Sequence, residues 1–476
     1  MRVLFVASEL FPFVKVGGLG DVMAALPRAM RVLGADVRLL IPAYPELRAA
    51  ARVTGEATPL PALMGGGPAR LLPAEADGLP LYLLDQPAFF DRTENPYEHP
   101  ADLPHRFAAL AWAAAHLGRA GAADGWRPDL LHGHDWPAGL MPAYVTYGEA
   151  PRPATVMTIH NIAFQGRFAP SLLEALGLPA ASFTPEGVEF HGDIGFLKAG
   201  LKLADRICTV SPTYAREIQQ AGGHGLEGLL AHRNGHLQGI LNGVDRTVWN
   251  PATDPHLVSR YDLKHPSRRL PNRPDFQRRL GLEEDADAPL FAAISRLDPL
   301  KGLDLVLDNV DHLVARGAQL AVIGTGDPHA EGAFRQAAQR HPGRVAAFIG
   351  YDEPLAHRAY AAADVILVPS RQEPCGLTQL YAQAYGALPL VRRTGGLADT
   401  VVGVTPETLA DGTATGFQFD AATGWALGEA LNGALDLFED GAAWRQVQRQ
   451  GMAARFGWEG PARAYLELYG TIPGVR

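Results

Sequence analysis

A short run of apolar residues followed by a segment with helical periodicity recurs along the whole chain, and this repetition limits the possible folds. Apolar runs without alternation are typical of parallel strands that are buried on both faces. After the first run, Val22, Leu26 and Leu33 fall on one face of a helix. Alternating strands and helices of this kind predict a doubly wound α/β architecture.

The apolar runs form two sets, which a Pro- and Arg-rich stretch separates. The predicted strands of the first set are 3–7, 37–41, 82–84, 130–131, 155–159, 207–210 and 239–241, and those of the second set are 290–294, 320–323, 345–349, 365–368 and 388–391. A chain of 476 residues exceeds one ordinary hydrophobic core. We therefore predict two such domains, at residues 1–243 and 244–455.

Polar residues gather directly after the apolar runs. In open α/β sheets the ligand crevice lies outside the carboxyl ends of the strands, so both domains are expected to present a polar, ligand-binding edge. These residues are Glu9, His132, His134, His160, Asn161, Asn242, Arg296, Gly324 and Tyr351.

Composition narrows the functional classes. Hydrophobic residues make up 47% of the chain and charged residues 20%, and the formal net charge is −9. This acidic balance argues against a general nucleic-acid binder. The two cysteines form no C-x-x-C pair, which favours a reduced cytoplasm. Because no stretch approaches 18 apolar residues, we expect no membrane span.

The segment KVGGLGDV at residues 15–22 stands between a predicted buried strand and a helix. Gly17 and Gly18 allow close backbone approach to an anion, the helix N-terminus supplies free N–H groups, and Lys15 adds a positive charge. This combination suits a diphosphate, although an ordinary Gly-rich turn explains it equally well. The dinucleotide fingerprint is absent, because Met23 occupies the position of its third glycine.

The segment SRLDPLKG at residues 295–302 places two cations after a predicted strand. Arg296 can hold phosphate oxygens with two hydrogen bonds, and Lys301 acts as a point charge. Surface salt bridges are the alternative, and taken alone this segment favours them.

The segment PSRQEPCGLTQ at residues 369–379 also follows a predicted strand. Glu373 precedes a bend with exposed amides, where a carboxylate can bind sugar hydroxyls or balance developing positive charge. A helix cap with an acidic neighbour is the alternative. Cys375 is better explained as a small packed side chain than as a nucleophile.

The segments HGHDW at 132–136 and TIHN at 158–161 resemble metal-binding patterns. No third and fourth ligand stands at motif spacing, so a zinc site is not favoured. Asp135 beside Trp136 instead indicates a hydrogen-bonding carboxylate next to an aromatic platform, which suits a sugar.

Taken together, the motifs resemble the bacterial glycogen synthase and plant starch synthase family over nearly the whole chain. The matching segments, in the family's order, are KVGGLGDV, HGHDW, HNIAFQG, GFLKAGLKLADRICTVSPTYAREI, NGVD, SRLDPLKGLD, GTGDP, GYDEP, EPCGLTQLYA and RRTGGLADTV. The resemblance implies a GT-B fold, with two Rossmann-like domains facing across a cleft. It also implies a last helix within 456–476 that crosses back to the N-terminal domain, and neither a metal nor a cofactor.

The family implies a retaining transfer of glucose from ADP-glucose to an α-1,4-glucan, which would bind mainly to the N-terminal domain. The residues that the resemblance assigns to catalysis are Lys15, His160, Arg296, Lys301 and Glu373. Those that it assigns to substrate binding are Gly17, Gly18, Asp21, Asn161, Asn242, Tyr351, Cys375, Gly376, Leu377 and Thr378, with Asp135 and Tyr97 on the acceptor side.

Three other interpretations remain. A Rossmann oxidoreductase would need the dinucleotide fingerprint that the first strand–helix turn lacks. A non-catalytic glucan-binding module would have no use for three cations near strand ends. Another GT-B transferase, of the sucrose or trehalose-phosphate synthase type, is disfavoured by EPCGLTQ. The resemblance favours ADP-glucose over UDP-glucose as donor but leaves the choice open.

Overall fold

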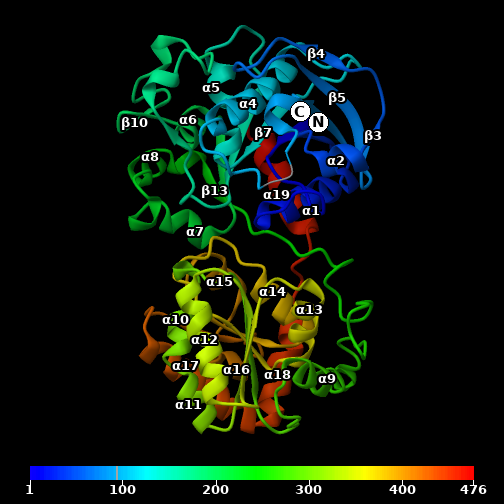
Figure 1. Ribbon diagram of the computed structural model, residues 1–476, viewed down its shortest axis with the longest axis vertical. Coiled ribbons are helices and arrows are strands. Elements are labelled where there is room, and N and C mark those ends of the chain that lie inside the picture. The colour runs from blue at the N-terminus through cyan, green and yellow to red at the C-terminus, as the bar shows by residue number, and fades with distance from the viewer. Residues whose placement is uncertain (93–94, 476) are drawn as a thin grey trace. The chain divides into compact units, whose positions relative to one another are not determined.

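The computed structural model describes residues 1–92 and 95–475 (Figure 1). The chain divides into two compact units. The first comprises Met1–Gly243 together with Trp458–Arg476, and the second comprises Val244–Gly457. Each unit is an α/β structure around its own sheet.

The sheet of the first unit has the strand order β13-β12-β8-β7-β1-β2-β6-β5-β3, and β4 also pairs with β5. The strands are β1 (Arg2–Val6), β2 (Asp36–Pro42), β3 (Arg52–Val53), β4 (Thr58–Leu60), β5 (Ala69–Ala76), β6 (Leu79–Asp85), β7 (Leu130–His134), β8 (Ala154–Ile159), β12 (Arg206–Thr209) and β13 (Leu237–Gly239). Strands β9 (Arg167–Phe168), β10 (Glu189–Phe190) and β11 (Asp193–Gly195) form a second, small sheet.

The first strand lies between β2 and β7, and both pairings are parallel. The strand order therefore reverses direction at β1, which is the position where ligands bind in doubly wound sheets. The helices of this unit are α1 (Gly18–Val32), α2 (Pro45–Ala50), α3 (Pro87–Phe90), α4 (Leu103–Ala120), α5 (Met141–Thr146), α6 (Phe196–Leu203), α7 (Pro212–Glu217), α8 (Glu227–His232) and the C-terminal α19 (Glu459–Gly470), which packs on α1.

The sheet of the second unit is parallel throughout, in the order β16-β15-β14-β17-β18-β19. Its strands are β14 (Leu290–Ile294), β15 (Gln319–Gly324), β16 (Val345–Ile349), β17 (Val365–Val368), β18 (Leu388–Arg392) and β19 (Phe417–Phe419). Its helices are α9 (Asn272–Leu280), α10 (Leu303–Leu307), α11 (Val310–Ala315), α12 (Pro328–Arg340), α13 (Glu353–Ala362), α14 (Thr378–Tyr385), α15 (Gly395–Thr400), α16 (Pro406–Ala410), α17 (Gly424–Glu439) and α18 (Gly441–Ala453).

Both faces of this second sheet are covered by helices (Figure 1). Phe291 and Ala293 belong to one core cluster, with residues of α10, α11, α12 and α17. Leu290 and Ala292 belong to the other cluster, with residues of α9, α13 and α14. Successive side chains of β14 thus enter opposite layers, which explains why the strand is an unbroken apolar run.

The prediction of two doubly wound α/β domains is confirmed, and each predicted strand overlaps an observed one. The antiparallel strands β3, β4 and β5, the small sheet of β9, β10 and β11, and the short β19 were not predicted. The run 239–241 lies too late, because β13 ends at Gly239.

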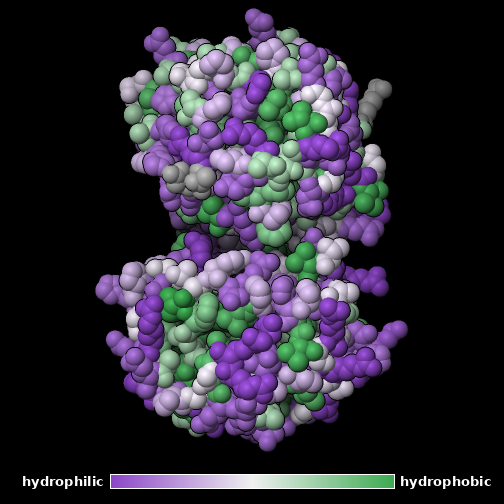
Figure 2. Space-filling view, turned by 45° about the vertical axis from the view of Figure 1, so that its right-hand side comes forward, coloured by the Kyte–Doolittle hydropathy of each residue, from purple (hydrophilic) through white to green (hydrophobic). Residues whose placement is uncertain are grey.

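Within residues 1–92 and 95–475, no helix is long and apolar enough to cross a membrane. Figure 2 shows hydrophobic residues dispersed among hydrophilic ones on the face it presents.

Candidate functional site

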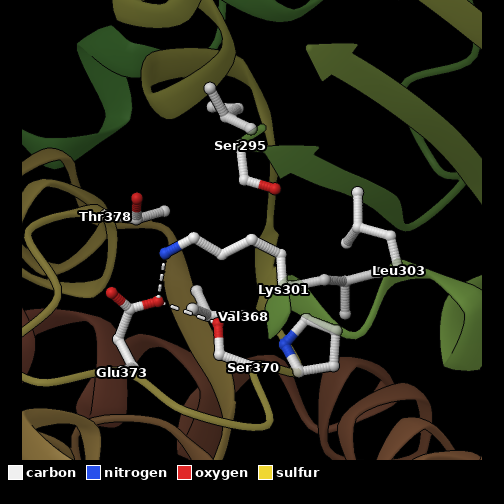
Figure 3. Close-up of a pocket in the computed structure, with 10 residues that line it drawn as sticks. Ser295, Lys301, Leu303, Val368, Ser370, Glu373 and Thr378 are labelled. Atoms are coloured by element: carbon white, nitrogen blue, oxygen red, sulfur yellow. Dashed lines mark hydrogen bonds and ion pairs between the residues drawn. The ribbon is translucent and has the colours of Figure 1, made fainter. Parts of the chain in front are cut away.

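The second unit carries a small pocket where its strand order reverses, between β14 and β17. The loops after these two strands supply Lys301 and Glu373. Lys301 Nζ donates a hydrogen bond to Glu373 Oε2 at 2.7 Å, and Ser370 Oγ donates to the same oxygen at 2.8 Å (Figure 3). The pocket is lined by Ile294, Ser295, Lys301, Leu303, Leu367, Val368, Pro369, Ser370, Glu373 and Thr378.

Glu373 is largely buried, with 12% of its side chain exposed. Its Oε2 atom is occupied by Lys301 and Ser370, whereas Oε1 accepts no hydrogen bond from the residues that the structure describes. A carboxylate fixed through one oxygen keeps the other for a ligand hydroxyl. The ammonium beside it can balance an anionic group, so the pocket suits a ligand with both sugar and phosphate character.

An ion pair and a backbone hydrogen bond hold the segment after β17 against the segment after β14. Arg371 donates to both carboxylate oxygens of Asp304 at 2.6 Å, and its backbone N–H donates to the carbonyl of Leu300 at 2.7 Å. Neither Arg371 nor Ser370 was identified as functional from the sequence. Their position inside the PSRQEPCGLTQ segment was the available signal.

The segment that follows Glu373 is shaped by glycines. Gly376 has φ 72°, and a Cβ there would overlap the side chain of Gln379. A Cβ at Gly396 would overlap the backbone of Cys375, so α15 packs directly on this segment. Cys375 is buried, as its interpretation as a packed side chain predicts. Leu377 stands just before α14, and Thr378 is the first residue of the helix.

Arg296 and Tyr351 are the exposed members of the predicted set in this unit. The side chain of Arg296 is 65% exposed, and its Nη2 lies 3.2 Å from Asp298 Oδ2. Tyr351 follows β16, is 77% exposed and donates a hydrogen bond from its hydroxyl to Glu353 at 2.7 Å. The aromatic face of Tyr351 is therefore accessible to a flat ring.

In the first unit, the KVGGLGDV loop connects β1 to α1 at the point where the strand order reverses. Lys15 Nζ contacts Asp21 Oδ1 at 2.9 Å. A Cβ at Gly17 or Gly18 would meet no atom within 4 Å. The packing of this unit therefore does not require glycine there, whereas close approach of a ligand would.

Asp135 and the segment after β8 form one constellation. Asp135 has φ 58° and ψ −174°, a conformation that costs an L-residue energy. Its Oδ1 accepts hydrogen bonds from the backbone N–H groups of His160 at 2.7 Å and Asn161 at 3.3 Å. Burial raises the pKa of Asp135 to about 7. The adjacent strands β7 and β8 thus bring together three of the predicted residues.

Three neighbouring histidines lie in this region. His134 Nδ1 is 3.0 Å from His160 Nε2, and His132 is hydrogen-bonded to Tyr469 and Thr158, both at 2.6 Å. Burial lowers the pKa of His132 and His134 well below 6.5 and that of His160 to about 3, so all three are neutral at pH 7.

The hydrogen-bond partners of His134 and His160 indicate which ring nitrogen of each carries the proton. His134 Nε2 is buried and has no hydrogen-bond partner among the described residues. A buried N–H without an acceptor is costly, so the proton of His134 belongs on Nδ1, where it is donated to His160 Nε2. His160 then carries its own proton on Nδ1, where it can be donated to a ligand oxygen.

Tyr97 and Asn242 complete the predicted set in this unit. The Tyr97 hydroxyl donates to Glu9 Oε1 at 2.6 Å and lies 2.9 Å from Ser8 Oγ. Asn242 follows β13, and its Oδ1 is buried without a partner among the described residues. Those residues contain no group of three or more His, Cys, Asp or Glu able to hold a metal ion.

Comparison with known proteins gives matches over both units. Residues 2–232 match the family described as starch synthase catalytic domain, and residues 276–441 match glycosyl transferases group 1. The glycogen synthase of Roseobacter denitrificans is 51% identical, with 100% of both chains covered. A glycogen synthase of Rhodopseudomonas palustris is 49% identical, with 99% of this chain and 98% of the relative covered.

Two solved structures are also similar to the chain. The catalytic domain of starch synthase IV from Arabidopsis thaliana, bound to ADP and acarbose, has a TM-score of 0.88 at 30% identity, with 98% of each chain covered. A sucrose-phosphate synthase from Thermosynechococcus elongatus has a TM-score of 0.62 at 18% identity, with 99% of this chain and 98% of that chain covered, and shares the fold alone.

Proposed function

Because this chain belongs to the glycogen synthase family of glycosyltransferases, we propose that it transfers glucose from ADP-glucose to the non-reducing end of an α-1,4-glucan, with retention of the anomeric configuration. The observation that carries the proposal is the partly buried Lys301–Glu373 pair in the pocket between β14 and β17. Its ammonium can balance the diphosphate of a nucleotide sugar, and its carboxylate can bind the sugar hydroxyls.

In this proposal, Lys301 and Arg296 stabilise the negative charge that grows on the diphosphate as the glucosyl bond breaks. A fixed cation in a partly buried site, such as Lys301, is effective because it needs no reorganisation during the reaction. Lys301 is held by Glu373, which supports its role. Arg296 is exposed and tied only to Asp298 among the described residues, so it is free to turn toward phosphate oxygens.

Glu373 binds the glucosyl group through Oε1, the oxygen that its protein partners leave open. Its negative charge also stabilises the positive charge that develops on the sugar ring. We assign no covalent nucleophile, because retention in this family fits a displacement on one face of the sugar. Cys375 therefore has no covalent role, and its burial supports that assignment.

The first unit supplies further contacts. Lys15 binds phosphate, Gly17 and Gly18 leave space for the ligand to approach the backbone closely, and His160 donates its Nδ1 proton to a sugar hydroxyl. Asp135 fixes the backbone of His160 and Asn161, as its two hydrogen bonds indicate. We place the glucan acceptor mainly on this unit.

Tyr351 is proposed to stack on adenine, and its exposed ring supports this role. The ADP bound to the Arabidopsis starch synthase domain supports adenosine over uridine in the donor. A cytoplasmic location stays a prediction, supported by two buried cysteines that form no disulfide.

The reaction can be tested with radiolabelled ADP-glucose and glycogen. If glucose is added through α-1,4 bonds at non-reducing ends, β-amylase will release the label from the product as maltose. Label that resists β-amylase, or that never enters the polymer, would contradict the proposed reaction.

A further inference from the structure

The buried carboxylate of Glu9 lies beneath the loop that carries Lys15. Only 3% of Glu9 is exposed. Its Oε2 accepts hydrogen bonds from the backbone N–H groups of Val16 at 2.8 Å and Gly17 at 3.1 Å. Two amides that point inward to a carboxylate cannot also bind phosphate, so any anion at this loop must use other groups.

The second oxygen of Glu9 is fixed from a distant part of the chain. Tyr97 donates its hydroxyl proton to Glu9 Oε1 at 2.6 Å. Burial, followed by the charge of Glu9, raises the pKa of Tyr97 well above 10, so the hydroxyl stays protonated and acts as a donor. The carboxylate therefore has partners on both oxygens.

Tyr97 is itself held in place by a buried arginine. Arg106 of α4 has 1% of its side chain exposed and donates to the backbone carbonyls of Pro96 at 2.9 Å and His99 at 3.3 Å, and to that of Glu98. Three carbonyls on one guanidinium fix the turn that contains Tyr97, because the planar group imposes its geometry on them.

We propose that Glu9 is a positioning residue for the Lys15 loop and that Tyr97 acts through it, so that Arg106, Tyr97 and Glu9 together hold residues 15–17 in the conformation that binds the donor diphosphate. The inference rests on the proposed function for the identity of that ligand. It gives Tyr97 a role on the donor side of the reaction, in place of the acceptor-side role that the family resemblance implies.

The loop conformation tests the inference without any nucleotide. In Glu9→Ala, the amides of Val16 and Gly17 lose a charged acceptor, so their hydrogen exchange should quicken by about tenfold or more. Glu9→Gln should retain most of the protection, because its amide oxygen can accept from both N–H groups. Unchanged exchange in Glu9→Ala would overturn the inference.

Steady-state kinetics separates positioning from general loss of structure. Glu9→Ala should lower kcat/KM for ADP-glucose by about 10- to 100-fold, with Tyr97→Phe having a smaller effect in the same direction. The KM for glycogen should stay within about twofold of the parent, which a disordered unit could not achieve. Tyr144→Phe is the matched control, because it removes another buried tyrosine hydroxyl, which donates to Leu176 O in the same unit.

The outcomes distinguish the two proposals. If the parent enzyme does not use ADP-glucose, the proposed function fails while the exchange experiment still tests the loop. If Tyr97→Phe raises the KM for glycogen and leaves donor kinetics unchanged, Tyr97 acts on the acceptor and the inference is wrong.

Discussion

Lys301 donates a hydrogen bond to Glu373 across two loops of the same unit, with 2.7 Å between Nζ and Oε2. The two residues are 72 positions apart in the sequence and meet because β14 and β17 are neighbours in the sheet. The two side chains form an ion pair in which 21% of Lys301 and 12% of Glu373 are exposed. Lys301 is therefore positioned before any substrate arrives.

Removal of a cation should reduce turnover. We expect Lys301→Ala to lower kcat by about 10²–10³, because the growing charge on the diphosphate loses a fixed counter-charge. Arg296→Ala should act in the same direction. Initial rates of glucan elongation at saturating ADP-glucose measure both effects. Turnover within a few-fold of the parent would show that the assignment is wrong.

Replacement of the cysteine beside Glu373 should have little effect. Cys375 is buried and has no covalent role in this account. Cys375→Ser should therefore keep substantial activity in the same elongation assay. Loss of all activity, with the circular dichroism spectrum and melting temperature of the parent retained, would mean that the thiol takes part in the chemistry.

The aromatic ring of Tyr351 should contribute to donor affinity. Stacking of a base on an aromatic side chain contributes about 1–3 kcal/mol, so Tyr351→Ala should raise the KM for ADP-glucose by about 5- to 150-fold. Tyr351→Phe keeps the ring and loses the hydrogen bond to Glu353, and it serves as the control. Equal KM values for ADP-glucose in the two variants would show that the ring of Tyr351 does not stack on the base.

The strands and the segments that carry the chemistry could be predicted from the sequence, because buried parallel strands are apolar throughout. The predicted run 290–294 coincides with β14. Strand β5 was missed, since buried and exposed residues alternate along part of its length and Pro73, a residue type rare inside strands, lies within it.

Contacts between distant side chains could not be predicted. Glu9 was noted only as a polar residue after a strand, and its partner Tyr97 lies 88 positions away. The turn that contains Tyr97 is held by Arg106 of α4, through hydrogen bonds that no local pattern encodes. The positive φ of Asp135 could not be predicted from the sequence either, because aspartate is common in ordinary turns.

The buried histidines should make the first unit sensitive to acid. In the unfolded chain their pKa values return to about 6.5, so below that pH the unfolded state binds more protons and stability falls. Below that pH, each buried histidine lowers the free energy of unfolding by up to about 1.4 kcal/mol per pH unit. The three histidines are His132, His134 and His160. Asp135 instead raises the free energy of unfolding as the pH falls from 7 to 4, because its raised pKa makes the folded state bind a proton that the unfolded state lacks.

Urea-dependent hydrogen exchange of the β7 and β8 amides, followed between pH 7 and pH 5, measures this effect. The free energy of unfolding should decrease as the pH falls. In His132→Gln it should decrease less over the same pH range. His329→Gln, at an exposed histidine of α12, should leave it unchanged. Stability that is constant or rises toward pH 5 would contradict the neutral, buried state of these histidines.

The choice of donor tests the central claim most directly. Glycogen would be incubated with radiolabelled ADP-glucose or UDP-glucose at equal concentrations, and the initial rate of label incorporation would be compared. We predict faster incorporation from ADP-glucose, with the rate lost in Lys301→Ala. Equal rates, or faster incorporation from UDP-glucose, would contradict the account.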